Sequence, residues 1–461
     1  MFHSKKRKIA VVATGVGISL VVISLIFIGI GEIGELFSFI KYVLLQGLGI
    51  AIAVTAAIFF FLRVTWRLHS KPMAIAMGVF VLGVLAVAYA AGALPTTIQF
   101  PAYKQTFGPG HGPDLPLKNV YQFFRHLDDF DRVDEIARDP NDVPSPLVWE
   151  ESVDVLDSEE GTTTVEMIEH ESEVVEIFLE TKEVLSEMGP EITFNYWTFD
   201  GQVPGPMLRV KEGDTVKLTI TNNPSSLHNH NIDLHAVTGP GGGASVTSVA
   251  PGETKSFTFK ALNPGLYVYH CAVANVPSHM AHGMYGMILV EPEGGLPEVD
   301  KEFYVMQGEF YSTGKIGQKG LQVFDTQAML DGNPDYVVFN GRTGGITGKM
   351  KAEVGDTVRI FFGNGGVNLI SSFHVIGEIF DRVYPEGAIG GELHKNVQTT
   401  TVPAGGATIV EFDVEYPGNY ILVDHALARL DKGGWGVLEV TGEKDDEIFS
   451  SDSSEHDHAS H

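Results

Sequence analysis

The sequence predicts an all-β body of two tandem Greek-key β-sandwich domains, preceded by three transmembrane α-helices and an acidic stalk. Three observations support this prediction: long apolar runs near the start, short alternating runs of Val, Ile, Thr and Phe from about Thr164 onward, and an internal repeat within those runs. The predicted parts, in order, are a membrane anchor over 1–95, a stalk over 96–163, sandwiches over 164–297 and 298–442, and a disordered acidic, His-containing tail over 443–461.

Three apolar runs, 9–30, 39–62 and 73–94, each approach the roughly 20 residues that a helix needs to span a bilayer. The first run follows the basic stretch 5–8 and lacks the small-residue cleavage site of a signal peptide, so it predicts a retained anchor. Basic residues cluster again over 63–71, and the positive-inside rule then places the N-terminus in the cytoplasm and the sandwiches outside. We therefore expect a multi-pass protein of the cell membrane.

The stretch after the third apolar run is acidic and polar, with Pro and Gly punctuation that is typical of a stalk. It holds one helical candidate, 117–138, which ends before Asp139 and Pro140 because a residue that precedes proline avoids helical geometry. The whole chain carries 58 Asp and Glu against 31 Lys and Arg, a net charge of −27. This charge disfavours nucleic acid as a partner, and it suits either docking of a basic protein or solubility of the external part.

The β-rich region contains an internal repeat of four segments in the same order. Residues 210–218 recur as 352–360, 249–259 as 402–412, 263–270 as 416–425, and 283–290 as 433–440. Self-similarity in a fixed order indicates a duplicated domain. The repeat predicts two sandwiches of similar length that join near residues 291–297.

Cys271 is the only cysteine, and it lies within a cluster of metal-ligating residue types. His270 precedes it directly, and His279 and Met284 follow. A thiolate, an imidazole and a thioether in this order form the later half of a His2CysMet copper site, in which soft sulfur ligands favour copper over zinc. The alternative is a buried free cysteine near incidental histidines.

An upstream segment supplies the remaining ligands, and strand parity predicts how they divide. Side chains on a strand alternate between its two faces. His230 and His235 are five residues apart and face opposite sides, as do the adjacent His270 and Cys271. This pattern predicts one site inside the domain, with His230 and Cys271, and a second on its outer face, with His235 and His270. Asp233 shares the face of His235.

The second repeat has lost the cysteine and the methionine but keeps His425 on the equivalent strand. A copper held only by His235 and His270 lacks a ligand, and His425 is the natural third. If His425 reaches that copper from a neighbouring subunit, the site lies at an interface and requires a closed ring of subunits.

Five motifs closely resemble those of the copper-containing dissimilatory nitrite reductases, and the likeness extends from about Val174 to Gly442. The motifs are HNIDLHAVTG (230–239), YHCAVA (269–274), HMAHGMYG (279–286), SFHVIGEIFD (372–381) and LVDHA (422–426). The resemblance implies a homotrimer of subunits with two cupredoxin domains each. It also implies one-electron reduction of nitrite to nitric oxide and water.

Carried over residue by residue, the resemblance implies one type 1 and one type 2 copper per subunit. The type 1 ligands would be His230, Cys271, His279 and Met284. The type 2 ligands would be His235 and His270, with His425 supplied by the adjacent subunit. Asp233 and His374 would handle protons, and Ile376 would shape the substrate pocket. Because three predicted spans and a stalk replace the export signal common in the family, the expected electron donor is a cupredoxin, a cytochrome c or a membrane respiratory component.

Two rival functions remain open at the level of sequence. A two-domain multicopper oxidase with a trinuclear cluster would need paired His-x-His motifs and a His-Cys-His core, whereas Ala272 follows Cys271 here. A membrane-anchored cupredoxin that only relays electrons would explain the cysteine site but would leave the outer-face residues without a role. For His282 and His228 we expect loop or surface roles, although His228 lies two residues from His230 and could share its face.

Overall fold

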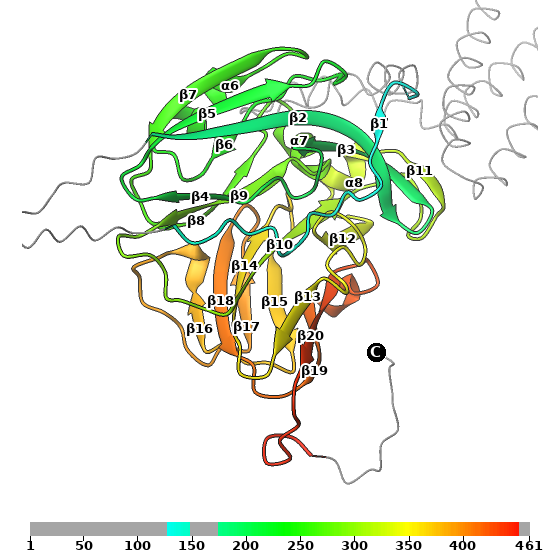
Figure 1. The fold of residues 1–461 in the computed structure, drawn as a ribbon. Helices are drawn as coiled ribbons and strands as arrows, with labels where there is room; N and C mark the ends of the chain where they lie inside the picture. The colour runs from blue at the N-terminus through cyan, green and yellow to red at the C-terminus, as the bar shows by residue number, and fades with distance from the viewer. Residues whose placement is uncertain (1–126, 148–173, 451–461) are drawn as a thin grey trace, which may run out of the picture. The chain divides into compact units, whose positions relative to one another are not determined.

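Two β-sandwiches form the part of the computed structural model that is described, which covers residues 127–147 and 174–450 (Figure 1). These residues, apart from 318–321, belong to one compact unit. The three predicted membrane spans lie within 1–126, outside the described residues, as do 148–173 and the tail 451–461. Across the two described ranges, no helix is long and apolar enough to cross a bilayer.

The first sandwich packs the sheet β3-β2-β5-β7 against the sheet β4-β9-β8-β6. Burial alternates along β5, where Val216, Leu218 and Ile220 are fully buried, as the alternating sequence predicts. The bounds are β2 Val174–Gly189, β3 Ile192–Phe199, β4 Leu208–Lys211, β5 Thr215–Asn222, β6 Asp233–Leu234, η2 Pro240–Gly243, α6 Ala244–Thr247, β7 Thr254–Lys260, β8 Gly265–His270, α7 Val276–Ala281 and β9 Tyr285–Glu291.

The second sandwich packs the sheet β12-β10-β14-β18-β16 against the sheet β13-β20-β19-β15-β17. Its core is aromatic: the rings of Phe362 and Phe373 stack at 3.9 Å between the sheets. The elements that follow β9 along the chain have the bounds β10 Lys301–Phe310, β11 Gly320–Gln322, α8 Thr326–Leu330, β12 Tyr336–Phe339, β13 Met350–Glu353, β14 Thr357–Asn364, β15 Ser371–Ile376, β16 Arg382–Tyr384, η3 Pro385–Gly387, β17 Thr399–Val402, β18 Ala407–Asp413, β19 Gly418–Asp424, η4 Leu427–Arg429 and β20 Trp435–Thr441; β11 is not part of the sheets of the second sandwich. The predicted mostly-β body is confirmed for the described residues.

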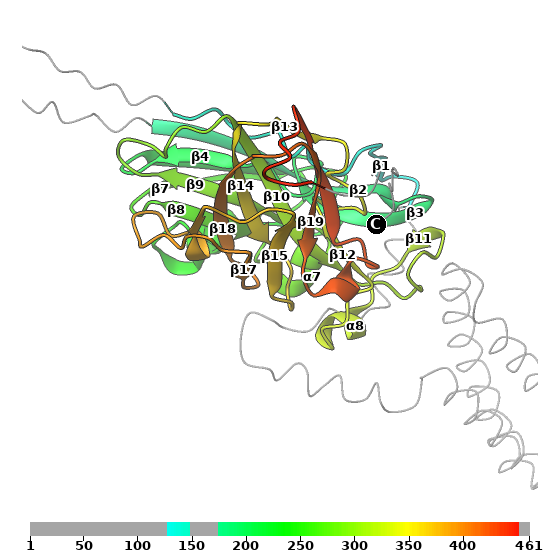
Figure 2. The same cartoon turned by 90° about the horizontal axis from the view of Figure 1, so that it is seen from below.

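The two sandwiches share a third hydrophobic core. It joins Tyr196 and Met287 of the first sandwich to Phe310 and Phe361 of the second, and β8 contacts β18 (Figure 2). At its edge, Glu302 pairs with Arg209 of the first sandwich at 2.8 Å and with Arg359 of the second at 2.7 Å. Apolar burial on this scale fixes the two sandwiches against each other.

The internal repeat appears in the structure as repeated hydrogen bonds. In the first sandwich, the Asn222 side-chain amide donates to the backbone oxygens of His228 and Val249, at 2.9 and 3.1 Å. In the second, the Asn364 amide donates to the backbone oxygens of Leu369 and Val402, at 2.8 and 3.1 Å. Both residues end equivalent strands, so the duplication preserves the polar framework as well as the strand order.

Residues 127–147 lie against both sandwiches, and the helix predicted over 117–138 is wrong for 127–138. Strand β1, Asp131–Arg132, pairs in parallel with β2, and Ile136 is fully buried. The Arg138 amide donates to the Val203 oxygen at 3.0 Å. Pairing of this backbone with β2 and Val203 outweighs its local helical tendency. Residues 117–126 lie outside the described residues.

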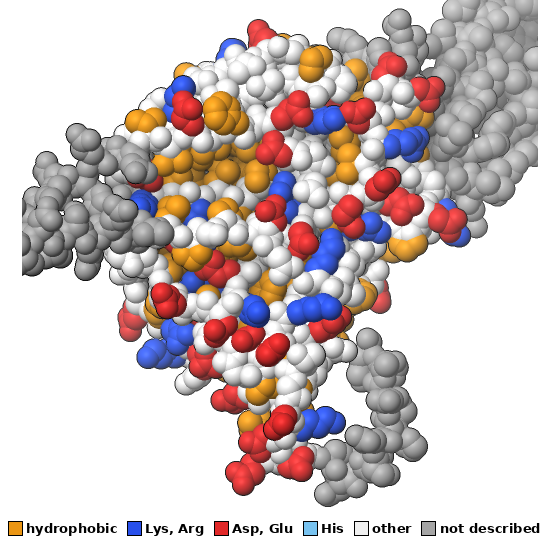
Figure 3. Space-filling model, in the orientation of Figure 1, with side chains coloured by type: hydrophobic (Ala, Val, Ile, Leu, Met, Phe, Trp, Pro, Cys, Tyr) orange, Lys and Arg blue, Asp and Glu red, His pale blue; other side chains and the backbone are white. Residues whose placement is uncertain are grey.

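Charged side chains are interspersed on the visible face of the body. Acidic groups cover both sandwiches and are mixed with Lys and Arg (Figure 3). On this face the acidic composition therefore produces a surface of mixed sign. Residues 443–450 follow β20 without a further helix or strand.

Candidate metal centre

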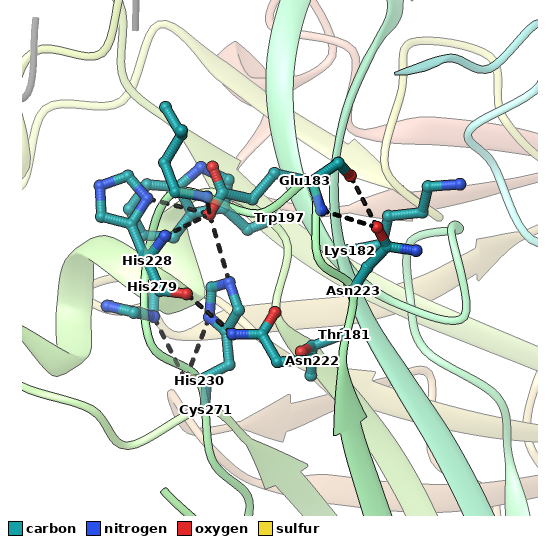
Figure 4. Close-up of polar contacts among 12 residues, drawn as sticks. Thr181, Lys182, Glu183, Trp197, Asn222, Asn223, His228, His230, Cys271 and His279 are labelled. Carbon is teal, nitrogen blue, oxygen red and sulfur yellow. Dashed lines mark hydrogen bonds and ion pairs between the residues drawn. The ribbon is translucent and has the colours of Figure 1, made fainter. Parts of the chain in front are cut away.

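His230, Cys271 and His279 form a buried cluster with the dimensions of a metal site. Their ligand atoms lie within 4.8 Å of one another. The Cys271 Sγ atom is 3.9 Å from His230 Nδ1 and 3.2 Å from His279 Nδ1 (Figure 4). Met284, fully buried, is tied to the cluster through its backbone oxygen, which accepts the Cys271 amide at 3.1 Å.

Four different elements position these side chains. His230 forms an isolated bridge with Val249, Cys271 directly follows β8, and Met284 directly precedes β9. His279 lies in α7, whose N-cap Asn275 accepts a hydrogen bond from the Ser278 amide. The cluster thus collects residues from one end of the sandwich, where strands give way to loops.

The chemistry of the cluster fits a soft metal ion. Burial raises the pKa of the Cys271 thiol to about 12, so this thiol does not ionise without a cation beside it. Burial also lowers the pKa of His230 and, more strongly, that of His279, which keeps both imidazoles neutral. Two neutral imidazoles, a thiol that ionises on metal binding and a nearby thioether match the donor set of a type 1 copper.

An aromatic layer covers the outer side of this cluster. The Trp197 ring stacks on His282 with centroids 4.1 Å apart, is tilted against His228 at 4.3 Å, and makes a T-shaped contact with His279 at 4.7 Å. His282 lies in the turn after α7, as expected of a loop residue, but it is only 6% exposed, so the surface alternative is wrong. The stacking of the indole buries it.

His228 turns toward Glu183 and not toward the thiol. The imidazole Nδ1 lies 3.0 Å from Glu183 Oε1, and His230 Nε2 lies 3.5 Å from the same oxygen (Figure 4). Burial alone raises the pKa of Glu183, but the hydrogen bond from His228 and the contacts with both imidazoles outweigh burial and hold that pKa well below its usual value.

A second pair of histidines, His235 and His270, lies next to the cluster, since His270 directly precedes Cys271. His235 Nε2 and His270 Nε2 are 3.2 Å apart with perpendicular rings, a distance that lets both nitrogens face one ion. His270 Nδ1 lies 3.1 Å from the Cys271 oxygen, which leaves Nε2 free. Asp233 is opposite His270 in the β6–β8 register, and a Cβ on Gly242 would lie 2.0 Å from Asp233 Oδ1. The glycine-rich turn therefore fixes the position of this carboxylate.

The remaining predicted site residues lie together on the second sandwich. His374 and Ile376 belong to β15, His425 follows β19, and the His374 and His425 rings are 5.5 Å apart. Ile376 is 42% exposed and His425 is also exposed. Among the residues described for one chain, the only group of three or more candidate ligands is the His230 cluster, so His425 does not complete the His235–His270 pair there.

Sequence reasoning missed three polar residues that support these side chains. Glu183 contacts two histidines, as described above. The Asn231 Oδ1 atom accepts the Ala272 amide at 2.6 Å and thereby ties the two ligand segments together. Buried Asp424, beside His425, accepts from the Gln307 side chain at 3.0 Å. The positions of Asn231, between predicted ligands, and of Asp424, next to His425, were usable signals, whereas Glu183 carried none.

Known proteins share both the sequence and the fold of this region. A family model described as multicopper oxidase matches residues 182–295. A copper-containing nitrite reductase of Neisseria meningitidis serogroup A is 57% identical over 279 residues, which cover 60% of this chain and 72% of that protein. One from Neorhizobium galegae is 36% identical over 306 residues, covering 61% and 79%.

Two solved structures have similar folds. The copper nitrite reductase from Nitrosomonas europaea matches with a TM-score of 0.52 and 34% identity, over 60% of this chain and 96% of that chain. The copper-containing nitrite reductase from Thermus scotoductus matches with a TM-score of 0.52 and 30% identity, over 59% and 63%. The matched share of this chain is similar in extent to the two sandwiches.

Proposed function

Since the chain belongs to the family of copper-containing nitrite reductases, we propose that it reduces nitrite to nitric oxide and water at a type 2 copper that a type 1 copper supplies with electrons. The reaction consumes one electron and two protons for each nitrite. The observation that carries the proposal is the arrangement of two ligand sets on opposite sides of one peptide bond, between His270 and Cys271.

In this proposal the inner cluster holds the type 1 copper through His230, Cys271, His279 and Met284. When copper is bound, the inner site exchanges single electrons, and the outer site offers the positive charge that an anionic substrate requires. The protein supplies a buried set of ligands for the inner site and a direct covalent link from Cys271 to His270.

The outer site would be completed by His425 from an adjacent subunit of a homotrimer. Two features support this proposal. His235 and His270 lack a third histidine within the described part of one chain, and His425 is exposed beside His374. Exposed Ile370, Ile379 and Leu427 add apolar surface to the second sandwich, as expected of a subunit interface.

Proton delivery falls to Asp233 and His374 in this arrangement. Asp233 is half-buried on the strand that faces His270, where it can hydrogen-bond an oxygen of bound nitrite. The imidazole of His374, with Nδ1 held by the Gln398 oxygen, provides a second proton-donating group. Exposed Ile376, two residues farther along β15, would limit the space beside the substrate.

We also propose that the N-terminal apolar runs anchor the protein in the cell membrane with both sandwiches outside. The donor would then be a cupredoxin, a cytochrome c or a membrane respiratory component. Protease protection of intact cells tests the topology: external protease should remove the sandwiches. Their full protection in intact cells would contradict it.

The enzymatic proposal is tested by anaerobic nitric oxide production from nitrite with an artificial reductant. The copper-loaded protein should turn over, and His425→Ala should lose turnover while keeping the visible band of the type 1 copper. His394→Ala, which removes an exposed histidine of the same sandwich, is the matched control. No turnover from a fully loaded protein would favour a cupredoxin that only relays electrons.

A further inference from the structure

Glu183 is a fully buried carboxylate beside the inner cluster. It lies on β2, and its side chain has no exposed surface. The Oε1 atom accepts the backbone amides of Leu227 and His228, both at 2.8 Å, and lies 3.0 Å from His228 Nδ1. Several hydrogen-bond donors therefore converge on the Oε1 atom, an arrangement that is typical of an ionised carboxylate.

Glu183 and the thiol meet opposite nitrogens of one imidazole. His230 Nδ1 faces Cys271 Sγ, whereas His230 Nε2 lies 3.5 Å from Glu183 Oε1 (Figure 4). Both the His230 and Glu183 side chains are fully buried, so water does not screen this contact. The imidazole therefore transmits the effect of the carboxylate to the metal position.

The equivalent carboxylate of the second sandwich shows which contacts of Glu183 are structural and which are specific to the first sandwich. Thr181 pairs with Asn222 and Gln307 pairs with Asn364, so Glu183 and Glu309, each two residues farther on, hold equivalent positions. Glu309 also accepts loop amides, from Asn368 at 3.3 Å and from Leu369 at 2.7 Å, but its other described partner is the Tyr311 hydroxyl. Holding the loop is common to both carboxylates, whereas contact with histidine distinguishes Glu183.

We propose that Glu183 is a positioning residue that orients His230 and lowers the reduction potential of the type 1 copper. A carboxylate behind a ligating imidazole increases the basicity of the ligand. A buried negative charge also favours the more positive oxidation state of the metal. The inference rests on the type 1 copper of the proposed function and not on nitrite turnover.

The test is the reduction potential of the copper-loaded Glu183→Gln protein, measured by spectroelectrochemistry of the visible band. The glutamine oxygen keeps both loop amides, and only the charge is lost. We expect the preference for Cu(II) over Cu(I) to fall about tenfold, an upward shift of about 59 mV for this one-electron couple. The electron paramagnetic resonance spectrum of the oxidised copper should change as well.

Two control variants separate charge at this position from other effects. Glu180→Gln removes the same charge from an exposed position on β2, and Glu309→Gln removes the equivalent carboxylate; both should keep the wild-type potential. If Glu183→Gln does not fold, Glu183→Asp withdraws the carboxylate from His230 and should also raise the potential. A wild-type potential in a folded variant at Glu183, or an equal shift in Glu180→Gln, would overturn the proposal.

Failure of the proposed function would look different. A wild-type protein that shows the type 1 band but no nitrite turnover would contradict nitrite reduction, and the potential of Glu183→Gln would still decide this inference. Unchanged turnover with an unchanged potential would overturn the inference alone.

Discussion

The two sandwiches share one polar framework but fill the same internal position in different ways. Cys271 in the first and Asp424 in the second both lie six residues after the glycine that begins β8 or β19. Asp424 is buried and pairs with Arg429, and its carboxylate accepts from Gln307 at 3.0 Å and from the Ser372 amide at 3.2 Å. The second sandwich therefore compensates its buried charge internally.

In the first sandwich, the side chains at the corresponding positions form the candidate metal site. The position of His230, which bridges Val249, corresponds to Ser371, which pairs with Val402. The Ser371 hydroxyl donates to Gln307 at 2.8 Å, whereas His230 and Cys271 converge on each other. The difference teaches that one duplicated fold can fill the same internal position with a hydrogen-bonded polar cluster or with a set of metal-ligating side chains, and only the second arrangement can support redox chemistry.

Replacing the thiol should have the largest effect on this comparison. Cys271→Ala removes the only soft anionic ligand, so we expect loss of the visible type 1 band and a fall of nitric oxide formation to the level without protein. Visible spectroscopy and anaerobic turnover measure both. Asp424→Asn, at the equivalent position, should keep the band; its loss there would show that the two positions are not independent.

Breaking the polar cluster of the second sandwich should come next. Asp424→Ala leaves the Arg429 guanidinium and the Gln307 amide without their buried acceptor, which should cost about 3–5 kcal/mol of unfolding free energy. Urea denaturation followed by tryptophan fluorescence measures this cost. A change below about 1 kcal/mol would mean that water replaces the carboxylate.

Removing copper should have a smaller effect that originates in the first sandwich. Binding to the folded state alone stabilises it by roughly 2.7 kcal/mol when free copper is about 100 times its dissociation constant. We expect chelation to lower the urea midpoint of the wild type. Chelation should leave the midpoint of Cys271→Ala nearly unchanged, and an equal shift in both proteins would assign the effect to other sites.

The smallest expected effect is a pH dependence of the second sandwich. Burial, with Asp381, Glu415 and Asp413 nearby, raises the pKa of Glu378 to about 7 from 4.5. A raised pKa in the folded state means that this contribution to stability is complete below about 4.5 and is lost as the pH rises through about 7. Glu378→Gln should reduce the change of the urea midpoint with pH between about 4.5 and 7, whereas Glu392→Gln, at an exposed position, should not.

Sequence anticipated the features that local spacing encodes. The pairs His230 with Cys271 and His235 with His270 follow from alternation, and their atoms lie 3.9 and 3.2 Å apart. The assumption that all four residues lie on regular strands was only partly correct, because β6 comprises Asp233–Leu234 alone and His230 forms only an isolated bridge. The predicted division of the ligands does not depend on long strands, because His230 and His235 are only five residues apart and His270 and Cys271 are adjacent.

Features that depend on distant segments were not predictable from one sequence. Glu183 reaches His230 from another strand, and its neighbours in the chain give no sign of this contact. His282 is buried because Trp197 of β3 stacks on it. Likewise, residues 127–138 are not helical, because Asp131–Arg132 pair with β2 and Ala137 bridges Val203, contacts that no local pattern encodes.

The segment 127–147 has a mechanical consequence. Its backbone is hydrogen-bonded to Val203 of the first sandwich. It is also hydrogen-bonded to the second sandwich, where the Tyr304 amide donates to the Pro140 oxygen at 2.8 Å. The Asn340 side chain also donates to the Arg138 oxygen at 3.0 Å. A pull on the chain before this segment would therefore load both sandwiches at once, through several hydrogen bonds.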